Sequence, residues 1–235
     1  MRWYSWIILS LFIFIALSVI FLLIKKESKD QKVKMTTKEL MYIVSFSTLA
    51  VTLGFIEIPL GTIIPGGKLD FSEVVILTSF LILGIKNTSI IIILRSVIRI
   101  LIPNELDFMM QLLGEGIAIT ASFIILFSTV IFNKLFKRSK KPLLYAISIE
   151  HEKPNLIDYV FLPLITTIFL VILLFVFHYF ITVPIYAKIY AEIYVGFKAK
   201  FLVIMPFTIL NIIKGLASPL IYLVIKPQIE KMVIY

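Results

Sequence analysis

Long apolar segments constrain the fold of this chain more than any other feature of its sequence. A helix needs about 20 predominantly apolar residues to cross the hydrocarbon core of a bilayer. Hydrophobic residues make up 60% of the chain, against about 45–50% in soluble domains. We therefore predict an all-α integral membrane protein. Its seven apolar segments are at about residues 4–24, 39–60, 72–85, 87–102, 109–133, 157–183 and 201–225.

The segments divide the chain into two parts. The first segment is followed by the basic linker KKESKDQKVKMTTK, and Met35 offers a second plausible start. No small-residue cleavage site precedes Lys25, so an uncleaved helix is expected rather than a signal peptide. We expect residues 1–35 to form an additional N-terminal transmembrane helix with its linker, and residues 36–235 to form a six-helix membrane domain.

The third and fourth segments are short for full crossings of a bilayer. They meet at the sequence Gly84-Ile85-Lys86-Asn87. Gly and Asn favour turns, so we predict a tight turn here between two tilted or partly shielded helices.

Basic residues predict how the chain lies in the membrane. If the linker after the first segment is cytoplasmic, the inner side carries about three times as many Lys and Arg residues as the outer side. This predicts a multi-pass protein with its carboxyl terminus in the cytoplasm and its amino terminus outside. The Lys-rich, Arg-poor composition is typical of an AT-rich bacterial genome, so we expect a bacterial plasma membrane. The positive charge is then a topology signal, and the expected partner is the lipid bilayer rather than nucleic acid.

Lys214 stands inside the last apolar segment, where a Lys costs about 2.5–3.5 kcal/mol of insertion free energy. Asn211 precedes it by one turn, and Thr208 and Ser218 extend the same helix face into a polar stripe. Ionisable groups at membrane depth usually face a partner or a wet cavity. Two interpretations stay open: a hydrogen-bonded seam with Lys214 paired to an acid, or the polar wall of a ligand site.

Other ionisable groups fall within the apolar segments. Glu115, between Gly114 and Gly116, is the likeliest internal acid, either paired with Lys214 or an Arg or contacting a ligand. Arg95 is expected to need an acid, with Glu57 or Glu73 as candidates. Arg99 is expected to extend to the outer interface.

The outer loop IPLGTIIPGGKLDFSE between the second and third segments is rich in Pro and Gly, so it is expected to be a shaped loop. Asp70 and Glu73 have the spacing of a helix-capping pair. Lys68 is a candidate to close over a ligand. Tyr186, the first of three Tyr residues spaced by four, is expected to lie in an interfacial belt or to stack on a flat ligand.

The sequence lacks the motifs of several enzyme classes. It contains no cysteine, no GxxxxGK[ST] phosphate loop, no HExxH and no GxSxG. Only two His residues occur, His151 and His178. We therefore expect no metal site, no catalytic residues and no enzymatic activity. Two alternatives remain: a membrane enzyme using Glu115 or Glu57 as an acid–base group, and a purely structural subunit in which an acid neutralises Lys214.

Three stretches together resemble one family. The loop KLDFSEVVIL, the pattern Asn211-x-x-Lys214-Gly215 and the stretch VPIYAKIY are similar to the riboflavin-specific S component, the substrate-binding subunit of an energy-coupling factor (ECF) vitamin transporter. The resemblance covers about residues 36–228. It implies a six-helix bundle that binds riboflavin as the transported ligand from the extracellular side, without any cofactor.

The resemblance also implies residue roles and partners. Asn211 and Lys214 would hydrogen-bond the polar edge of the isoalloxazine ring, and Lys68, Leu69, Asp70 and Phe71 would belong to a lid. The small pair Ala50 and Gly54 would dock on a transmembrane coupling subunit, which works with two ATPase subunits. The last helix departs from the family pattern, since Thr208, Ile209 and Leu210 separate Pro206-Phe207 from Asn211. A flavin nucleotide or another vitamin therefore stays open as the ligand.

Overall fold

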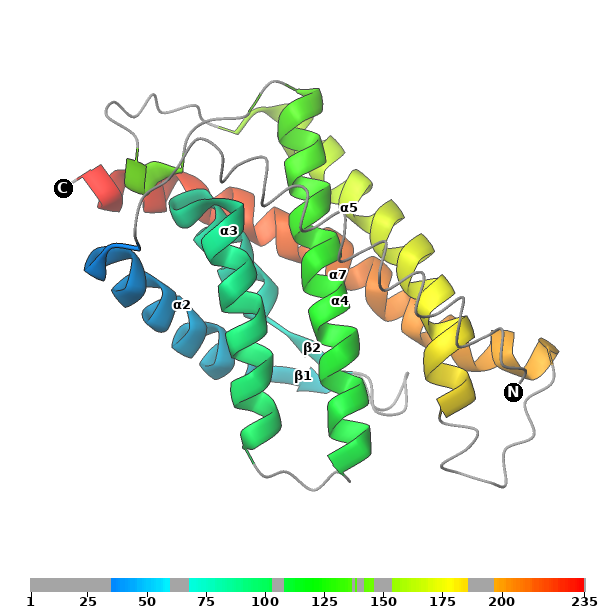
Figure 1. Cartoon of the computed structure of the whole chain (residues 1–235). Coiled ribbons are helices and arrows are strands. Elements are labelled where there is room, and N and C mark those ends of the chain that lie inside the picture. The colour runs from blue at the N-terminus through cyan, green and yellow to red at the C-terminus, as the bar shows by residue number, and fades with distance from the viewer. Residues whose placement is uncertain are drawn as a thin grey trace.

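The computed structural model describes residues 35–59, 68–102, 108–136, 138, 142–145, 154–185 and 197–234. Its helices are α2 (Thr37–Phe55), α3 (Ser72–Leu101), α4 (Phe108–Leu135), α5 (Leu156–Phe177) and α7 (Phe197–Ile234), with the short elements η1 (Leu143–Tyr145) and η2 (His178–Thr182) (Figure 1). The first apolar segment, residues 4–24, lies outside the described residues.

Helix α3 folds back on itself. Gly84 interrupts it with φ 78° and ψ 178°, a conformation that only glycine adopts readily. The two arms lie side by side, because Arg95 Nη1 donates to Ser72 Oγ at 2.8 Å and Ser79 Oγ donates to Thr88 Oγ1 at 3.2 Å. The predicted turn between the third and fourth segments is confirmed. The helix is interrupted at Gly84, the first residue of the predicted turn sequence.

A two-stranded ribbon joins α2 to α3. Strand β1 (Glu57–Pro59) pairs antiparallel with β2 (Lys68–Asp70), in a register that places Glu57 opposite Asp70. The ribbon brings the end of the outer loop against the start of α3. It is the one departure from an all-helical fold among the described residues.

Side-chain caps fix the start of two helices. Thr36 accepts a hydrogen bond from Glu39 N, and the Glu39 carboxylate accepts one from Thr36 N, which is a capping box. Asn155 and Asp158 form the same reciprocal pair at the start of α5. Such caps satisfy backbone N–H groups that a helix start leaves without partners.

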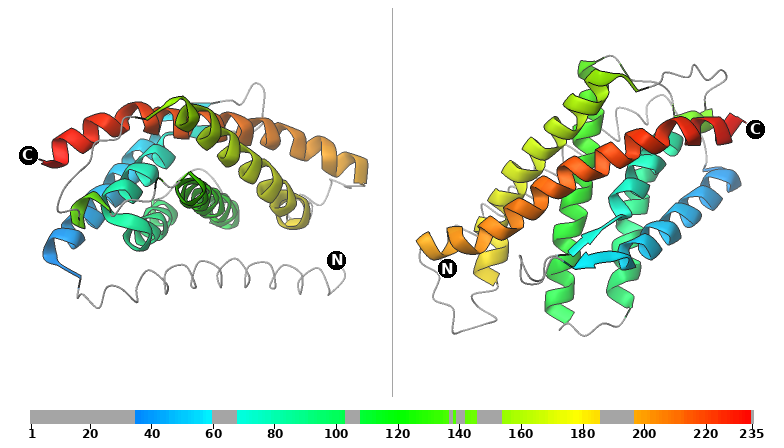
Figure 2. Two further views of the ribbon diagram at one scale, coloured as in Figure 1. Left: turned by 90° about the horizontal axis from the view of Figure 1, so that it is seen from above. Right: turned by 180° about the vertical axis from the view of Figure 1, so that it is seen from behind.

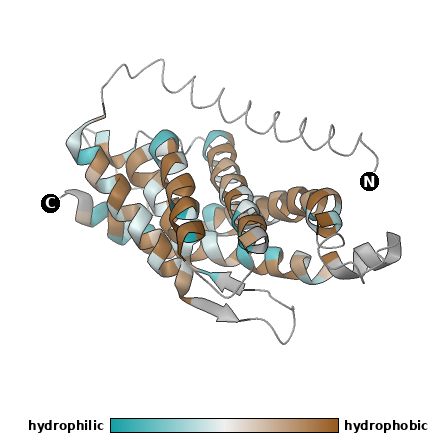
Figure 3. Ribbon diagram, turned by 60° about the horizontal axis from the view of Figure 1, so that its bottom comes forward, coloured by the Kyte–Doolittle hydropathy of each residue, from teal (hydrophilic) through white to brown (hydrophobic). Residues whose placement is uncertain are grey.

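The hydrophobic pattern of the helices fits a bilayer. Within the described part of the chain, four helical segments are long and apolar enough to cross a membrane: Ser72–Leu101, Gln111–Leu135, Leu156–Ile185 and Ile204–Met232. Because α3 reverses at Gly84, its two arms cannot form one straight crossing. Figure 3 shows hydrophobic residues along most of the helix lengths. Many large ones remain exposed, such as Ile172 on α5 (57%) and Val224 on α7 (62%), as expected for surfaces that face lipid.

Two packing layers hold the helices together. One buried cluster joins α3, α4, α5 and α7 through Leu77, Ile125, Leu170 and Tyr222. The other joins α2 to α3 and to η1. Figure 2 shows α5 and α7 crossing on one side of the molecule, and α2 beside α3 on the other. The predicted all-α membrane fold is confirmed at this level, while the six-plus-one helix count stays a prediction.

Candidate substrate-binding site

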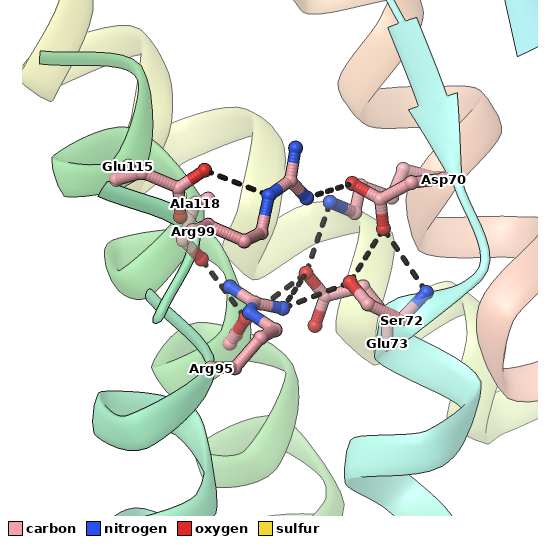
Figure 4. A network of polar contacts seen from close by, with 9 residues as sticks. Asp70, Ser72, Glu73, Arg95, Arg99, Glu115 and Ala118 are labelled. Carbon is pink, nitrogen blue, oxygen red and sulfur yellow. Dashed lines mark hydrogen bonds and ion pairs between the residues drawn. The ribbon is translucent and has the colours of Figure 1, made fainter. Parts of the chain in front are cut away.

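Six ionisable side chains from four elements meet in the interior. They are three carboxylates and three cations, so the group has no formal net charge (Figure 4). We call it the charged cluster, and it consists of Asp70 from β2, Glu73, Arg95 and Arg99 from α3, Glu115 from α4 and Lys214 from α7.

Glu73 lies at the centre of the charged cluster. Its Oε1 atom lies 2.9 Å from Lys214 Nζ and 3.6 Å from Arg95 Nη1, and it accepts a hydrogen bond from Ser122 Oγ at 3.0 Å. The Glu73 and Arg95 side chains are buried, at 0% and 1% exposure. Burial of charges is tolerated when they are paired and hydrogen-bonded. Glu73 therefore ties α3, α4 and α7 together.

Arg99 forms the second centre. Its Nε atom lies 3.0 Å from Glu115 Oε1, and its Nη1 atom lies 3.8 Å from Asp70 Oδ2. Its guanidinium also lies 5.8 Å from the Phe55 ring centroid, a cation–π contact. The two carboxylates draw the Arg99 guanidinium to the charged cluster, and its side chain keeps 17% exposure. Its extension to the outer interface stays a prediction.

Asp70 and Glu73 do not form the predicted capping pair at the start of α3, whose N-cap residue is Phe71. The Oδ1 atom of Asp70 accepts hydrogen bonds from Ser72 N and Ser72 Oγ, while Glu73 points into the charged cluster instead. Burial by itself raises the pKa of Asp70. The charge of Lys214, the Ser72 hydrogen bond and the two arginines outweigh burial and hold that pKa below its usual value.

Lys214 and Asn211 lie where the polar stripe predicts, on the buried face of α7. Their exposures are 7% and 5%, and Ser218 is buried as well, whereas the neighbouring Ile212 and Ile213 are exposed. Among the described residues, no hydrogen bond joins the Asn211 amide to another side chain. The acid beside Lys214 is Glu73, and Glu115 takes Arg99 instead.

The outer-loop candidates reach the charged cluster through Asp70. Lys68 and Leu69 belong to β2 and precede it, and Phe71 is the residue before the first turn of α3. Their proposed role as a lid stays a prediction. Tyr186 lies outside the described residues.

Gln111 supports the end of α3, since its Nε2 atom donates to the carbonyls of Arg99 and Ile102.

Ala50 and Gly54 lie on the buried face of α2, and Ala50 is 0% exposed. A methyl group added to Gly54 would lie 2.7 Å from Arg99 Nη1. In this structure the small pair therefore packs against α3, and its docking on a coupling subunit stays a prediction. Small residues allow close helix packing inside a chain as well as between chains.

Sequence reasoning named Glu73 as a candidate partner of Arg95, which the structure confirms, but missed it as the partner of Lys214. Ser72 and Ser122 were missed altogether. A hydroxyl in an apolar helix gives no signal of its own, because it can donate to the carbonyl four residues earlier, as Ser122 also does to Ala118 O at 2.9 Å.

The charged cluster is suited to polar recognition. Several of its buried atoms have no hydrogen-bond partner among the residues that the structure describes: Glu73 Oε2, Glu115 Oε2, Arg95 Nε and Arg95 Nη2. Buried polar groups are normally satisfied, so unpaired ones call for an explanation, such as a ligand. Among the described residues, no group of three His, Cys, Asp or Glu side chains could hold a metal ion.

His178 lies near the face of α7 that carries Asn211 and Lys214. Its Nδ1 atom lies 3.1 Å from Thr182 Oγ1, and its ring stacks on Phe207 with centroids 5.0 Å apart. His178 is thus a hydrogen-bonded helix residue that also stacks on an aromatic ring. It lies in η2, a short π-helical turn between α5 and the end of the span.

Comparison with known proteins gives a likeness of fold. No protein-family model matches the sequence, and no curated protein matches it significantly. Among solved structures, the chain is similar to one described as the S component of a bacterial ECF transporter, with a TM-score of 0.56 and 20% sequence identity. The match covers 83% of this chain and 97% of the other. The described chain thus has an S-component-like membrane fold.

Proposed function

We propose that this protein is the membrane-embedded substrate-binding subunit of an ECF-type vitamin transporter, and that its ligand is riboflavin, bound from the extracellular side. The observation that carries the proposal is the shared fold, which extends over almost the whole of the S component compared. The proposal takes no catalytic step, and the partners it implies are a transmembrane coupling subunit and two ATPase subunits.

The buried polar side chains of the fold support a ligand that has a polar edge. Lys214 and Asn211 lie on one buried face of α7, and the Asp70 end of the outer loop lies in the same charged cluster. Riboflavin has a flat, largely apolar ring with carbonyl and N–H groups along one edge. A few placed polar groups in an apolar surround are the usual way to orient such a ligand.

A purely structural subunit is the second candidate, and the Lys214–Glu73 contact at 2.9 Å favours it. In that role the ion pair would only stabilise the packing of α7 on α3. The unpaired donors of Arg95 and the unpaired oxygens of Glu73 and Glu115 would then have no use. Their presence favours the binding subunit.

Binding of riboflavin to the purified protein tests the proposal. Riboflavin fluorescence is titrated with the full chain in detergent, and the purified sample is inspected for a yellow chromophore. We expect quenching that saturates at submicromolar riboflavin. This corresponds to a binding free energy more favourable than about −8.2 kcal/mol, the value for a Kd of about 1 μM. A folded sample that quenches no fluorescence at micromolar riboflavin contradicts the proposal. Thiamin and biotin, titrated as competitors, separate riboflavin from other vitamins.

A further inference from the structure

Glu73 uses only half of its hydrogen-bonding capacity. All three of its contacts, with Lys214, Arg95 and Ser122, go to Oε1. Its Oε2 atom is buried and has no hydrogen-bond partner in the described part of the chain. An ionised carboxylate accepts hydrogen bonds at both oxygens, and a buried acceptor left unpaired destabilises the fold. The empty acceptor therefore needs a donor that the described residues do not supply.

Lys214 supplies the complementary capacity beside it. Its ammonium group carries three N–H donors, and Glu73 is its ion-pair partner among the described residues. Lys214 Nζ and Glu73 Oε1 are 2.9 Å apart, so the ammonium donors lie beside the carboxylate whose other oxygen, Oε2, is the unpaired acceptor. This pattern matches a ligand edge on which a carbonyl adjoins an N–H group.

The charge of the cluster sets the class of that ligand edge. Three carboxylates and three cations already balance one another within salt-bridge distance. An anionic edge would meet Glu73, and among the described residues each cation of the charged cluster already faces a carboxylate. A cationic edge would meet Lys214 and Arg95. Desolvating an uncompensated charge is far more expensive than desolvating a neutral amide. An uncharged edge therefore fits best.

We infer that Glu73 is a specificity-determining residue, which with Lys214 recognises an uncharged imide-like edge by accepting its N–H while Lys214 donates to the adjacent carbonyl. The inference rests on the proposed function, in which riboflavin offers such an edge at N3–H between two carbonyls. Arg95 and Ser122 hold the Glu73 carboxylate in place through Oε1.

The test compares riboflavin with 3-methylriboflavin, which lacks the N3–H donor, on the wild-type chain and on Glu73→Gln. In the variant, the amide oxygen will face Lys214 and Ser122, because these are donors. The amide N–H group then lies where the unpaired Oε2 atom of Glu73 lies in the wild type, so it cannot accept a hydrogen bond from N3–H of riboflavin. We expect the wild type to bind 3-methylriboflavin about tenfold or more weakly than riboflavin, the scale of one buried hydrogen bond to a charged group. In Glu73→Gln this ratio should fall to about threefold or less.

Glu230→Gln is the matched control. Glu230 is another buried carboxylate, at 7% exposure, near the far end of α7 and 3.9 Å from Lys226. This variant should keep the wild-type discrimination. A Glu73→Gln chain that still discriminates as the wild type does overturns the inference.

Two measurements on the wild type keep the inference testable if Glu73→Gln does not fold. Equal affinity for the two flavins overturns the Glu73 assignment and leaves the proposed function standing, whereas no binding of either flavin overturns both. In infrared difference spectra, a carboxylate band should shift when riboflavin binds and remain in place with 3-methylriboflavin. Carboxylate bands that respond alike to both flavins overturn the inference.

Discussion

Lys214 on α7 and Glu73 on the first arm of α3 form an ion pair in which Nζ and Oε1 lie 2.9 Å apart. Both side chains are buried, at 9% and 0% exposure. The pair connects the last helix to the hairpin that follows the outer loop. Any ligand that bonds to Lys214 therefore also affects the contact between these two helices.

Lys214→Ala should weaken riboflavin binding by about tenfold or more, because it removes a charged donor worth about 1.4 kcal/mol or greater. Fluorescence quenching by the full chain measures the change. Ile213→Ala is the control, since Ile213 is the adjacent, exposed residue. Unchanged affinity in Lys214→Ala would show that Lys214 does not contact the ligand.

Arg95→Met should destabilise the fold by about 3–5 kcal/mol, because it leaves a buried charge without one of its partners. Arg95 is 1% exposed and contacts both Glu73 and Ser72. Thermal unfolding in detergent measures the loss. Lys86→Met, an exposed cation at the hairpin turn, should have little effect. Equal melting temperatures for the two variants would contradict a structural role for Arg95.

Gly215→Ala should destabilise the packing of α7 on α5. An added methyl group would lie 2.7 Å from the Cα atom of Thr167, and backbone cannot move aside easily. Overpacking of this kind costs about 1–3 kcal/mol. Gly116→Ala is the matched control, because nothing lies within 4 Å of its added methyl. In a helix, the control should be neutral or stabilising. A Gly215→Ala chain as stable as Gly116→Ala would show that the two helices can separate at little cost.

Gly84→Ala should weaken the reversal of α3. Gly84 has φ 78°, and an added methyl group would lie 2.8 Å from Pro142 Cγ. Non-glycine residues in such conformations cost about 1–3 kcal/mol. We expect a lower melting temperature and weaker riboflavin binding, because both arms of the hairpin contribute to the charged cluster. Wild-type values for both quantities would contradict this account of the turn.

Tyr145 in η1 should titrate late. Burial, the hydrogen bond to Glu39 and the Glu39 charge raise the pKa of Tyr145 to about 12. A raised pKa means that its stabilising contribution is complete below the usual value of about 10 and is lost as the pH rises towards 12. The difference in melting temperature between the wild type and Tyr145→Phe should therefore shrink over this range. In Glu39→Gln, alkaline absorbance titration should show Tyr145 ionising at lower pH. A constant difference from pH 9 upward would contradict the assignment.

The sequence determined the kind of protein and the faces of its helices. Apolar length predicts membrane helices, because the hydrocarbon core has a fixed thickness. The helical period places Asn211, Lys214 and Ser218 on one face, and the structure buries that face. The turn at Gly84 could also be predicted from the sequence, since glycine followed closely by Lys86 and Asn87 ends an apolar run.

Only the tertiary structure decided which charges pair. Glu73 and Glu115 were both possible partners of a buried cation, and spacing along the chain carries no information about contacts between helices. The reversal of α3 brings Arg95 back to Ser72 and Glu73, and the crossing of α7 then brings Lys214 to the same carboxylate. Ala50 and Gly54 illustrate the same limit, because a small-residue pair permits close packing without naming the partner. Which helix lies opposite is fixed by the packing of the whole chain.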